Sequence, residues 1–257
     1  MIVLYILICV VLLILLPIVF SLLRAYILVN QRPINYLYDK RIKDGNYCYF
    51  DKLPYKTIDF SLALEDARFF YHPGYDIIAI KKALRRNLKE KRVVFGGSTI
   101  TQQLAKNLYF RFEPNLFRKI SELMISIYIE KKLSKIEILE LYLNVIYYGN
   151  DQYGLYDASK YYFNKDYTEL TVNQTFFLIC LLSAPTTANP LTNPEMFVRI
   201  RNKKLCQVLW TGDDKKYISL IKGYDINNLD PELQLNNRTP SKQIKMINEK
   251  YGAKIYK

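Results

Sequence analysis

The chain begins with an uninterrupted apolar run. Residues 2–23 carry no charged side chain and are almost entirely Ile, Leu and Val. At about 1.5 Å per helical residue, the run spans roughly 33 Å, which is enough for the hydrocarbon core of a bilayer. It lacks the basic start, the short apolar core and the small residues of a cleavable signal peptide. The pattern therefore predicts a single transmembrane anchor over residues 1–24, which Pro17 does not forbid.

The rest of the chain is dominated by helical periodicity from about residue 58 onward. Ile77, Ile80, Leu84 and Leu88 recur at helical spacing and form an apolar stripe. Basic residues cover the other sides of this segment, and we expect the basic run over residues 81–92 to meet lipid headgroups or water. The segment is typical of an amphipathic helix.

Two local signals mark further helix starts. Ser134 with Glu137, and Thr171 with Gln174, have the spacing of a capping box before an apolar run. The apolar runs that follow exceed strand length and lack strand alternation. The sequence therefore predicts a mainly α protein.

Composition shifts divide the chain into four parts. After the anchor, residues 25–49 form a linker, and weak alternation over residues 25–57 favours a short hairpin. Residues 50–215 form the main domain, and residues 216–257 form a polar C-terminal tail rich in Asn and Lys. No internal repeat interrupts this order.

Charge and cysteine usage narrow the function classes. The 37 Lys and Arg against 24 Asp and Glu give a formal net charge of +13, which favours a polyanionic partner such as a membrane surface or a phosphate-bearing substrate. No nucleic-acid-binding motif is present, so nucleic acid is not expected. Cys9 and Cys180 lie in apolar runs and should be buried; a Cys48–Cys206 pair stays open. The one histidine excludes a multi-histidine metal site.

Four ordered motifs carry the candidate chemistry. The strings are ALEDARFFYHPG over residues 63–74, GGSTITQQ over residues 96–103 with Lys-Asn at 106–107, Arg-Lys at 118–119 with Glu at 122, and ILELYLN over residues 138–144. The second string is rich in small, hydroxyl and amide groups, which suit phosphate and sugar, but it lacks the spacing of a Walker loop.

Together these motifs resemble the peptidoglycan glycosyltransferase family, which includes the polymerase domain of class A penicillin-binding proteins. The resemblance covers residues 50–212 and implies a lysozyme-like, two-lobed helical domain behind the single transmembrane helix. It implies polymerisation of lipid II into β-1,4-linked glycan strands, with inversion and release of undecaprenyl pyrophosphate. The transpeptidase domain that often follows has no room in this chain, so a monofunctional member is expected.

The resemblance assigns the chemistry to two carboxylates. Glu65 becomes the general base on the acceptor hydroxyl, and Glu122 becomes the second carboxylate, near the donor diphosphate or its metal. From the residues alone, Glu65 also fits a helix-end or salt-bridge carboxylate. Glu122 equally fits an i,i+4 ion pair with Arg118.

The remaining site residues follow from the same resemblance. Substrate contact is assigned to eight of them: Asp66, Ser98, Thr99, Gln102, Gln103, Lys106, Arg118 and Lys119. A structural place near the site is assigned to five others: Phe69, His72, Gly74, Gly97 and Asn144. His72 is expected to hydrogen-bond beside the turn at Gly74 rather than to act as a base.

The family also implies cofactors and surroundings. No organic cofactor is expected, and a divalent metal, Mg or Mn, could be held by Glu122. Partners are lipid II, the growing lipid-linked glycan, the membrane and wall-synthesis proteins. Counting basic residues alone would place the body of the chain inside the cell. The family's function places it outside, and we favour an extracytoplasmic domain on a single-pass plasma-membrane anchor because long domains translocate largely regardless of charge.

Two departures from the family keep alternatives open. Pro114 stands where an Arg is frequent, with Arg111 the nearest substitute, and Ser121 stands where a Lys is frequent. A lysozyme-like lytic hydrolase would share the fold and the carboxylate pair. A catalytically weak scaffold of a wall-synthesis complex would tolerate both departures.

Overall fold

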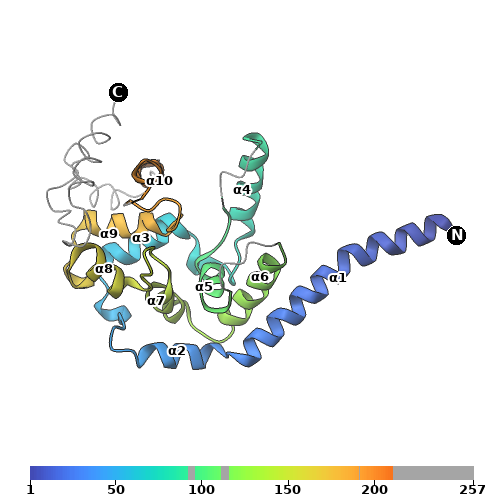
Figure 1. The fold of residues 1–257 in the computed structure, drawn as a ribbon, viewed down its shortest axis with the longest axis horizontal. Helices are drawn as coiled ribbons and strands as arrows, with labels where there is room; N and C mark the ends of the chain where they lie inside the picture. Colours follow the sequence, from blue (N-terminus) through green and yellow to red (C-terminus); the bar gives the residue numbers. More distant parts are fainter. Residues whose placement is uncertain (92–95, 111–115, 191, 211–257) are drawn as a thin grey trace. The chain divides into compact units, whose positions relative to one another are not determined.

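Helices dominate the computed structural model, which describes residues 1–91, 96–110, 116–190 and 192–210. Over these ranges no strand is present, and the β-type pairing consists of an isolated bridge between Tyr147 and Tyr153. The prediction of a mainly α fold is confirmed. The described chain forms a series of shorter helices after one long N-terminal helix (Figure 1).

The chain divides into two compact units. The first comprises Met1–Gly45 and Arg68–Tyr142, and the second comprises Asn46–Ala67 and Leu143–Lys257. The first contains α1 (Ile2–Gln31), α2 (Ile34–Ile42), the 3-10 turn η2 (Phe69–Tyr71), α4 (Ile77–Lys89), α5 (Ile100–Tyr109), α6 (Leu116–Glu130) and most of α7 (Lys135–Val145). The second contains η1 (Phe50–Lys52), α3 (Tyr55–Glu65), α8 (Leu155–Phe163), η3 (Tyr167–Glu169), α9 (Val172–Leu181) and α10 (Pro194–Trp210).

The long helix α1 is the predicted membrane anchor. It is long and apolar enough to cross a bilayer, and its apolar side chains are largely exposed. Among its described side chains, those that are buried are Ser21 and Ala25, where α1 packs on α6. Cys9 lies before this contact and is exposed, so the prediction that it is buried in protein is wrong, whereas Cys180 is buried as predicted.

The hairpin predicted within residues 25–57 is also wrong. Residues 25–31 continue α1, and α2, the 3-10 turn η1 and the start of α3 follow before residue 57. In α2, Ile34 is buried, and the hydroxyl of Tyr38 donates to Glu140 at 2.9 Å. These positions are one helical turn apart, so the alternation of Tyr with basic residues reflected a helix with one packed side rather than a strand.

The core of the first unit lies between α5 and α6, which pack side by side (Figure 1). Ile100 and Leu104 on α5, and Ile125 and Ile129 on α6, are fully buried. In contrast, the predicted apolar stripe of α4 is exposed, and none of the side chains of this helix is buried. The helix begins at Asp76, whose carboxylate accepts hydrogen bonds from two backbone N–H groups of the first turn.

The core of the second unit lies among α3, α9 and α10. The ring of Phe60 on α3 packs edge-on against Phe176 on α9, with centroids 5.3 Å apart. Phe177, also on α9, packs on Phe197 of α10 at 4.7 Å. The predicted capping box of Thr171 starts α9, so local sequence and tertiary packing agree on this helix.

Candidate active site

Glu122 lies buried in the first unit and contacts two cations. It is 1% exposed and sits in the middle of α6. The Nε of Arg118 lies 2.9 Å from its Oε1, and the Nζ of Lys119 lies 2.8 Å from its Oε2. The i,i+4 ion pair left open by the sequence therefore exists, and an i,i+3 pair accompanies it. Two cations compensate the buried carboxylate, which would otherwise be costly to ionise.

Lys119 connects two of the sequence motifs. Its ammonium donates at 2.8 Å to the hydroxyl of Ser98, which precedes α5, and also to Glu122. The side chain of Lys119 is nearly half exposed, whereas that of Glu122 is buried. The structure thus brings Ser98, Arg118, Lys119 and Glu122 together in a cluster with one cation open to solvent. Such an arrangement suits an anionic oxygen of a ligand.

Two predicted substrate contacts instead build the loop before α5. Thr99 caps the helix and forms a reciprocal capping box with Gln102. The hydroxyl of Thr99 donates to the carbonyl of Gly74 at 2.7 Å, and Gln102 is buried. A Cβ added to Gly97 would lie 3.0 Å from the Cα of Ile80, so this glycine permits a close approach of the backbone to α4.

Gln103 and Lys106 occupy the following turns of α5. The side-chain oxygen of Gln103 accepts a hydrogen bond from the hydroxyl of Tyr142 at 3.2 Å. Lys106 is exposed. Ser98, Gln102, Gln103 and Lys106 were predicted to contact the donor. Among them, the side chains of Ser98 and Lys106 are more accessible to solvent than the buried side chain of Gln102.

The end of the first motif forms a tight turn in the first unit. The Nδ1 of His72 accepts a hydrogen bond from the backbone N–H of Gly74 at 3.3 Å, and Lys135 donates to the carbonyl of His72 at 2.7 Å. The Lys135 ammonium also lies 4.4 Å from the ring centroid of buried Phe69. Gly74 has a φ of +93°, which favours glycine. These contacts fit the structural role expected for His72.

Glu65 lies in the second unit and is paired with a lysine that the sequence analysis missed. It is the last residue of α3, and buried Asp66 follows as the C-cap. The Nζ of Lys204, on α10, forms an ion pair with Oε1 of Glu65 and donates to the carbonyl of Ile179 at 3.0 Å. The side chains of Lys204 and Glu65 are 7% and 8% exposed. A buried carboxylate with a dedicated buried cation is uncommon and marks a candidate functional group.

A helical pattern could have pointed to Lys204. Phe197, Arg201 and Lys204 follow each other at spacings of four and three residues, and all three are buried. They share one side of α10 with the aromatic packing against α9. When this buried stripe is not considered, the Arg and Lys residues around it are typical of a solvent-exposed helix face.

Asn144 and Tyr148 also lie in the second unit. Asn144 exchanges two hydrogen bonds with the backbone of Cys48, at 2.8 and 2.9 Å, so its role is structural. Burial raises the pKa of the Tyr148 hydroxyl, and the nearby Cys48 and Glu65 raise it further. Within the described part of the chain this hydroxyl has no hydrogen-bond partner. Tyr148 therefore keeps its proton beside the charge of Glu65.

A divalent metal at Glu122 stays a prediction. Both oxygens of Glu122 face cations, and no group of three His, Cys, Asp or Glu side chains gathers in the described ranges. Mg²⁺ is usually bound through one or two carboxylates together with substrate phosphates, so this arrangement does not decide its presence. Among the described residues, Glu122 contacts Arg118 and Lys119.

The two departures from the family fall in different places. Pro114 and Arg111 lie outside the described residues. Ser121 is fully buried, and its hydroxyl lies within hydrogen-bonding distance of the carbonyls of Ser21, at 2.9 Å, and Phe117, at 3.1 Å. This position therefore faces the anchor helix.

Comparison with known proteins agrees with these motifs. The sequence profile of the transglycosylase family matches residues 31–209. The chain is 43% identical to penicillin-binding protein 1A of Aquifex aeolicus over 65% of its own length and 23% of that protein. It is 39% identical to penicillin-binding protein 1A of Vibrio cholerae over 71% of the chain and 22% of the relative. It is 41% identical to penicillin-binding protein 1A of Escherichia coli over 66% of the chain and 19% of that protein.

The chain thus spans about a quarter or less of the length of these curated relatives. The matched region contains all four motifs and both candidate carboxylates. The chain belongs to the transglycosylase family, which confirms the resemblance to the peptidoglycan glycosyltransferases.

Proposed function

We propose that the protein polymerises lipid II into β-1,4-linked glycan strands and releases undecaprenyl pyrophosphate with inversion at the anomeric carbon. Family membership supports a peptidoglycan glycosyltransferase in general. The observation that supports this specific reaction is the burial and ion pairing of two carboxylates. Glu65 and Glu122 are both buried, and each is ion-paired with at least one lysine. Two carboxylates in different electrostatic settings suit two roles in glycosyl transfer.

Glu65 acts as the general base in this proposal. Its carboxylate accepts the proton of the acceptor's 4-hydroxyl as that oxygen attacks the anomeric carbon of the donor. The bond between the anomeric carbon and the diphosphate oxygen breaks, and its electron pair leaves with the diphosphate. Attack opposite the leaving group gives inversion. Lys204 lies against this carboxylate and compensates its charge, because a buried carboxylate is costly without a nearby cation.

The cluster at Glu122 serves the leaving group. As the bond to the diphosphate breaks, negative charge grows on its oxygens and needs preorganised cations and donors. The half-exposed ammonium of Lys119 and the hydroxyl of Ser98 provide both. Glu122 holds Lys119 and Arg118 in place through its two oxygens, and exposed Lys106 adds charge nearby on α5 in the same unit.

The location follows from the substrate. Helix α1 would hold the domain at the outer surface of the plasma membrane, where a lipid-linked disaccharide is available. Wall-synthesis proteins are the expected partners there.

The test is turnover of labelled lipid II by the full chain in detergent, with wild type beside Glu65→Gln. Loss of a general base should lower the polymerisation rate by about 10²- to 10⁴-fold. Glu140→Gln is the matched control, because Glu140 is also buried but receives its hydrogen bond from Tyr38 on α2. We expect the control to keep near-wild-type activity.

Polymerisation by Glu65→Gln at the wild-type rate would overturn the assignment of the base. Release of muropeptides from purified sacculi, without polymer, would instead favour the lytic hydrolase. Binding of lipid II without turnover by the wild-type chain would favour the scaffold.

A further inference from the structure

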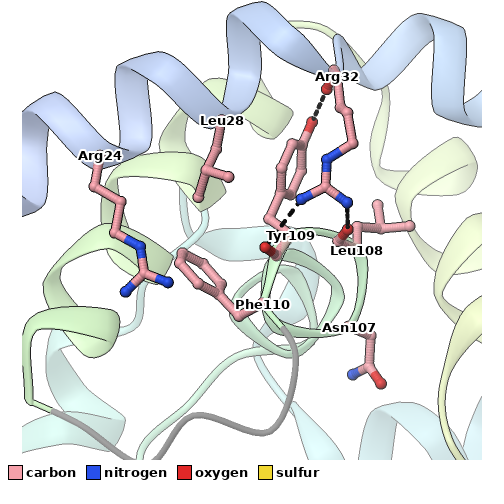
Figure 2. Close-up of a pocket in the computed structure, with 7 residues that line it drawn as sticks. All are labelled: Arg24, Leu28, Arg32, Asn107, Leu108, Tyr109 and Phe110. Carbon is pink, nitrogen blue, oxygen red and sulfur yellow. Dashed lines mark hydrogen bonds between the residues drawn. The ribbon is translucent and has the colours of Figure 1, made fainter.

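A pocket of about 380 Å³ opens in the first unit where the anchor helix α1 passes the end of α5. Figure 2 shows the side chains that line it. They are Arg24, Leu28 and Arg32 from α1, and Asn107, Leu108, Tyr109 and Phe110 from α5 and its C-cap. Two of these seven residues are cationic and none is acidic. The pocket therefore favours an anion with an apolar part.

The position of the pocket along α1 places it at the membrane surface. The uncharged run of residues 2–23 spans roughly 33 Å as a helix, about the thickness of the hydrocarbon core. Arg24 is the first charged residue after this run, and Arg32 lies about 12 Å further along the axis. The headgroup layer on each side of a bilayer is only several ångströms thick. Arg24 therefore lies at the depth of lipid phosphates.

Hydrogen bonds fix the wall of the pocket. The guanidinium of Arg32 donates to the carbonyls of Leu108 and Tyr109, at 3.2 and 3.1 Å, and so satisfies groups at the end of α5 (Figure 2). The hydroxyl of Tyr109 donates back to the carbonyl of Arg32 at 2.8 Å. Because these reciprocal bonds link α1 to α5, the pocket keeps its shape without a ligand.

Arg24 supplies the cation on the opposite side. Its guanidinium carbon lies 5.1 Å from the centroid of the Phe110 ring, which restricts the side chain to the rim of the pocket. Figure 2 shows the guanidinium turned toward that ring, with Leu28 on the adjacent turn of α1. A guanidinium next to apolar side chains matches a phosphodiester followed by hydrocarbon.

We propose that this pocket binds the phosphate of an anionic membrane glycerophospholipid. The phosphate contacts Arg24, and the glycerol and first acyl carbons pack on Leu28 and Phe110. The apolar lining and the depth on α1 favour a lipid over free phosphate. The bound lipid would fix the height of the first unit at the bilayer surface, independently of the reaction proposed above.

The experiment measures lipids retained by the full chain. Protein reconstituted in bilayers of mixed phosphatidylglycerol and phosphatidylcholine is released into mild detergent, and retained lipids are counted by native mass spectrometry. We expect one phosphatidylglycerol to be retained preferentially. Arg24→Gln should lower this retention about fivefold, the factor equivalent to about 1 kcal/mol for one basic residue at an anionic surface.

Two further variants make the test specific. Arg199→Gln removes the same charge from an exposed position on α10, to which no lipid contact is assigned, and should retain lipid like the wild type. Leu28→Trp fills the pocket while keeping both arginines, and should lower retention even if Arg24→Gln perturbs folding. Equal loss with Arg199→Gln, unchanged retention with Leu28→Trp, or displacement by excess inorganic phosphate would each overturn the proposal.

Discussion

Replacement of Lys204 by Met is the change that tests the proposed chemistry most sharply. Lys204 pairs with Glu65 and also donates to the carbonyl of Ile179, so it lies at the junction of α3, α9 and α10. Met keeps much of the volume of the side chain but removes the ammonium. The variant leaves a buried carboxylate without its dedicated cation, and removing one partner of a buried ion pair is strongly unfavourable.

The expected size of the effect follows from the burial of the pair. Both side chains are less than 10% exposed, so solvent screens the interaction weakly. Breaking a buried ion pair by removing one partner typically costs about 3–5 kcal/mol, and the Glu65 carboxylate avoids part of that cost by moving toward solvent. A base that leaves its position beside the acceptor hydroxyl transfers the proton poorly, and a displacement of about 1 Å can lower the rate by about 10²-fold. The kcat of Lys204→Met should therefore fall by about 10²-fold.

The assay is lipid II turnover, with kcat and KM measured separately. Lys204→Arg keeps the charge and should restore much of the wild-type kcat. Lys203→Met is the matched control, because Lys203 is the exposed neighbour on the same helix. KM should change little, since Lys204 acts through Glu65 rather than on the substrate.

A wild-type kcat in Lys204→Met, with only a lower melting temperature, would refute this reasoning. Lys204 would then hold three helices together without influencing the base. If Glu65→Gln is inactive in the same assay, a failure of the Lys204 prediction would not contradict the proposed role of Glu65 as the base.

Two further predictions concern stability. Gly149→Ala should destabilise the protein by about 2 kcal/mol or more, because Gly149 has a φ of +87° and an added Cβ would lie 2.7 Å from the carbonyl oxygen of Pro185. Chemical denaturation measures this loss against Gly45→Ala, where the added Cβ would meet nothing within 4 Å. Equal stability of the two variants would contradict the prediction. Asp166→Ala should cost about 0.5 kcal/mol at pH 7, since the carboxylate caps η3 but is mostly exposed. The backbone hydrogen bond from Thr168 is the largest cause that lowers the pKa of Asp166. The stabilisation by this carboxylate is therefore present above its ordinary pKa of 3.8 and is lost as pH falls through the lowered pKa. A difference in the free energy of unfolding between wild type and variant that grows on acidification would contradict this prediction.

Local signals in the sequence predicted helix starts well. The capping boxes at Thr171 and at Ser134 both form, with Glu137 accepting the backbone N–H of Ser134 at 2.7 Å. Their success has a physical basis, because all the interacting groups lie within one helical turn. The second string contained a third box at Thr99 and Gln102, and there the same chemistry was interpreted as substrate contact. A side chain that caps a helix cannot be distinguished from a ligand contact by residue type alone.

Long-range pairs could not be predicted in the same way. Lys204 and Glu65 are 139 residues apart, and their contact depends on how α10 packs against α3 and α9. Asn144 likewise reaches the backbone of Cys48 across 96 residues. The motif string identified Glu65 through family resemblance, but the cation that accompanies it lies outside every motif. Tertiary packing decides which of several basic residues on α10 is buried.

Ser121 shows why a departure from a family pattern needs the fold for its interpretation. As sequence, a serine where a lysine is frequent kept a catalytically weak scaffold open as an alternative. In the structure the side chain is fully buried and contacts the backbone of α1 at Ser21. A lysine that kept this orientation would place its ammonium against the anchor helix, at a high cost in desolvation. The cations that contact Glu122 come from Arg118 and Lys119, one turn earlier on α6, and both are retained. The substitution therefore fits close packing of α1 on α6 and leaves the charge beside Glu122 intact.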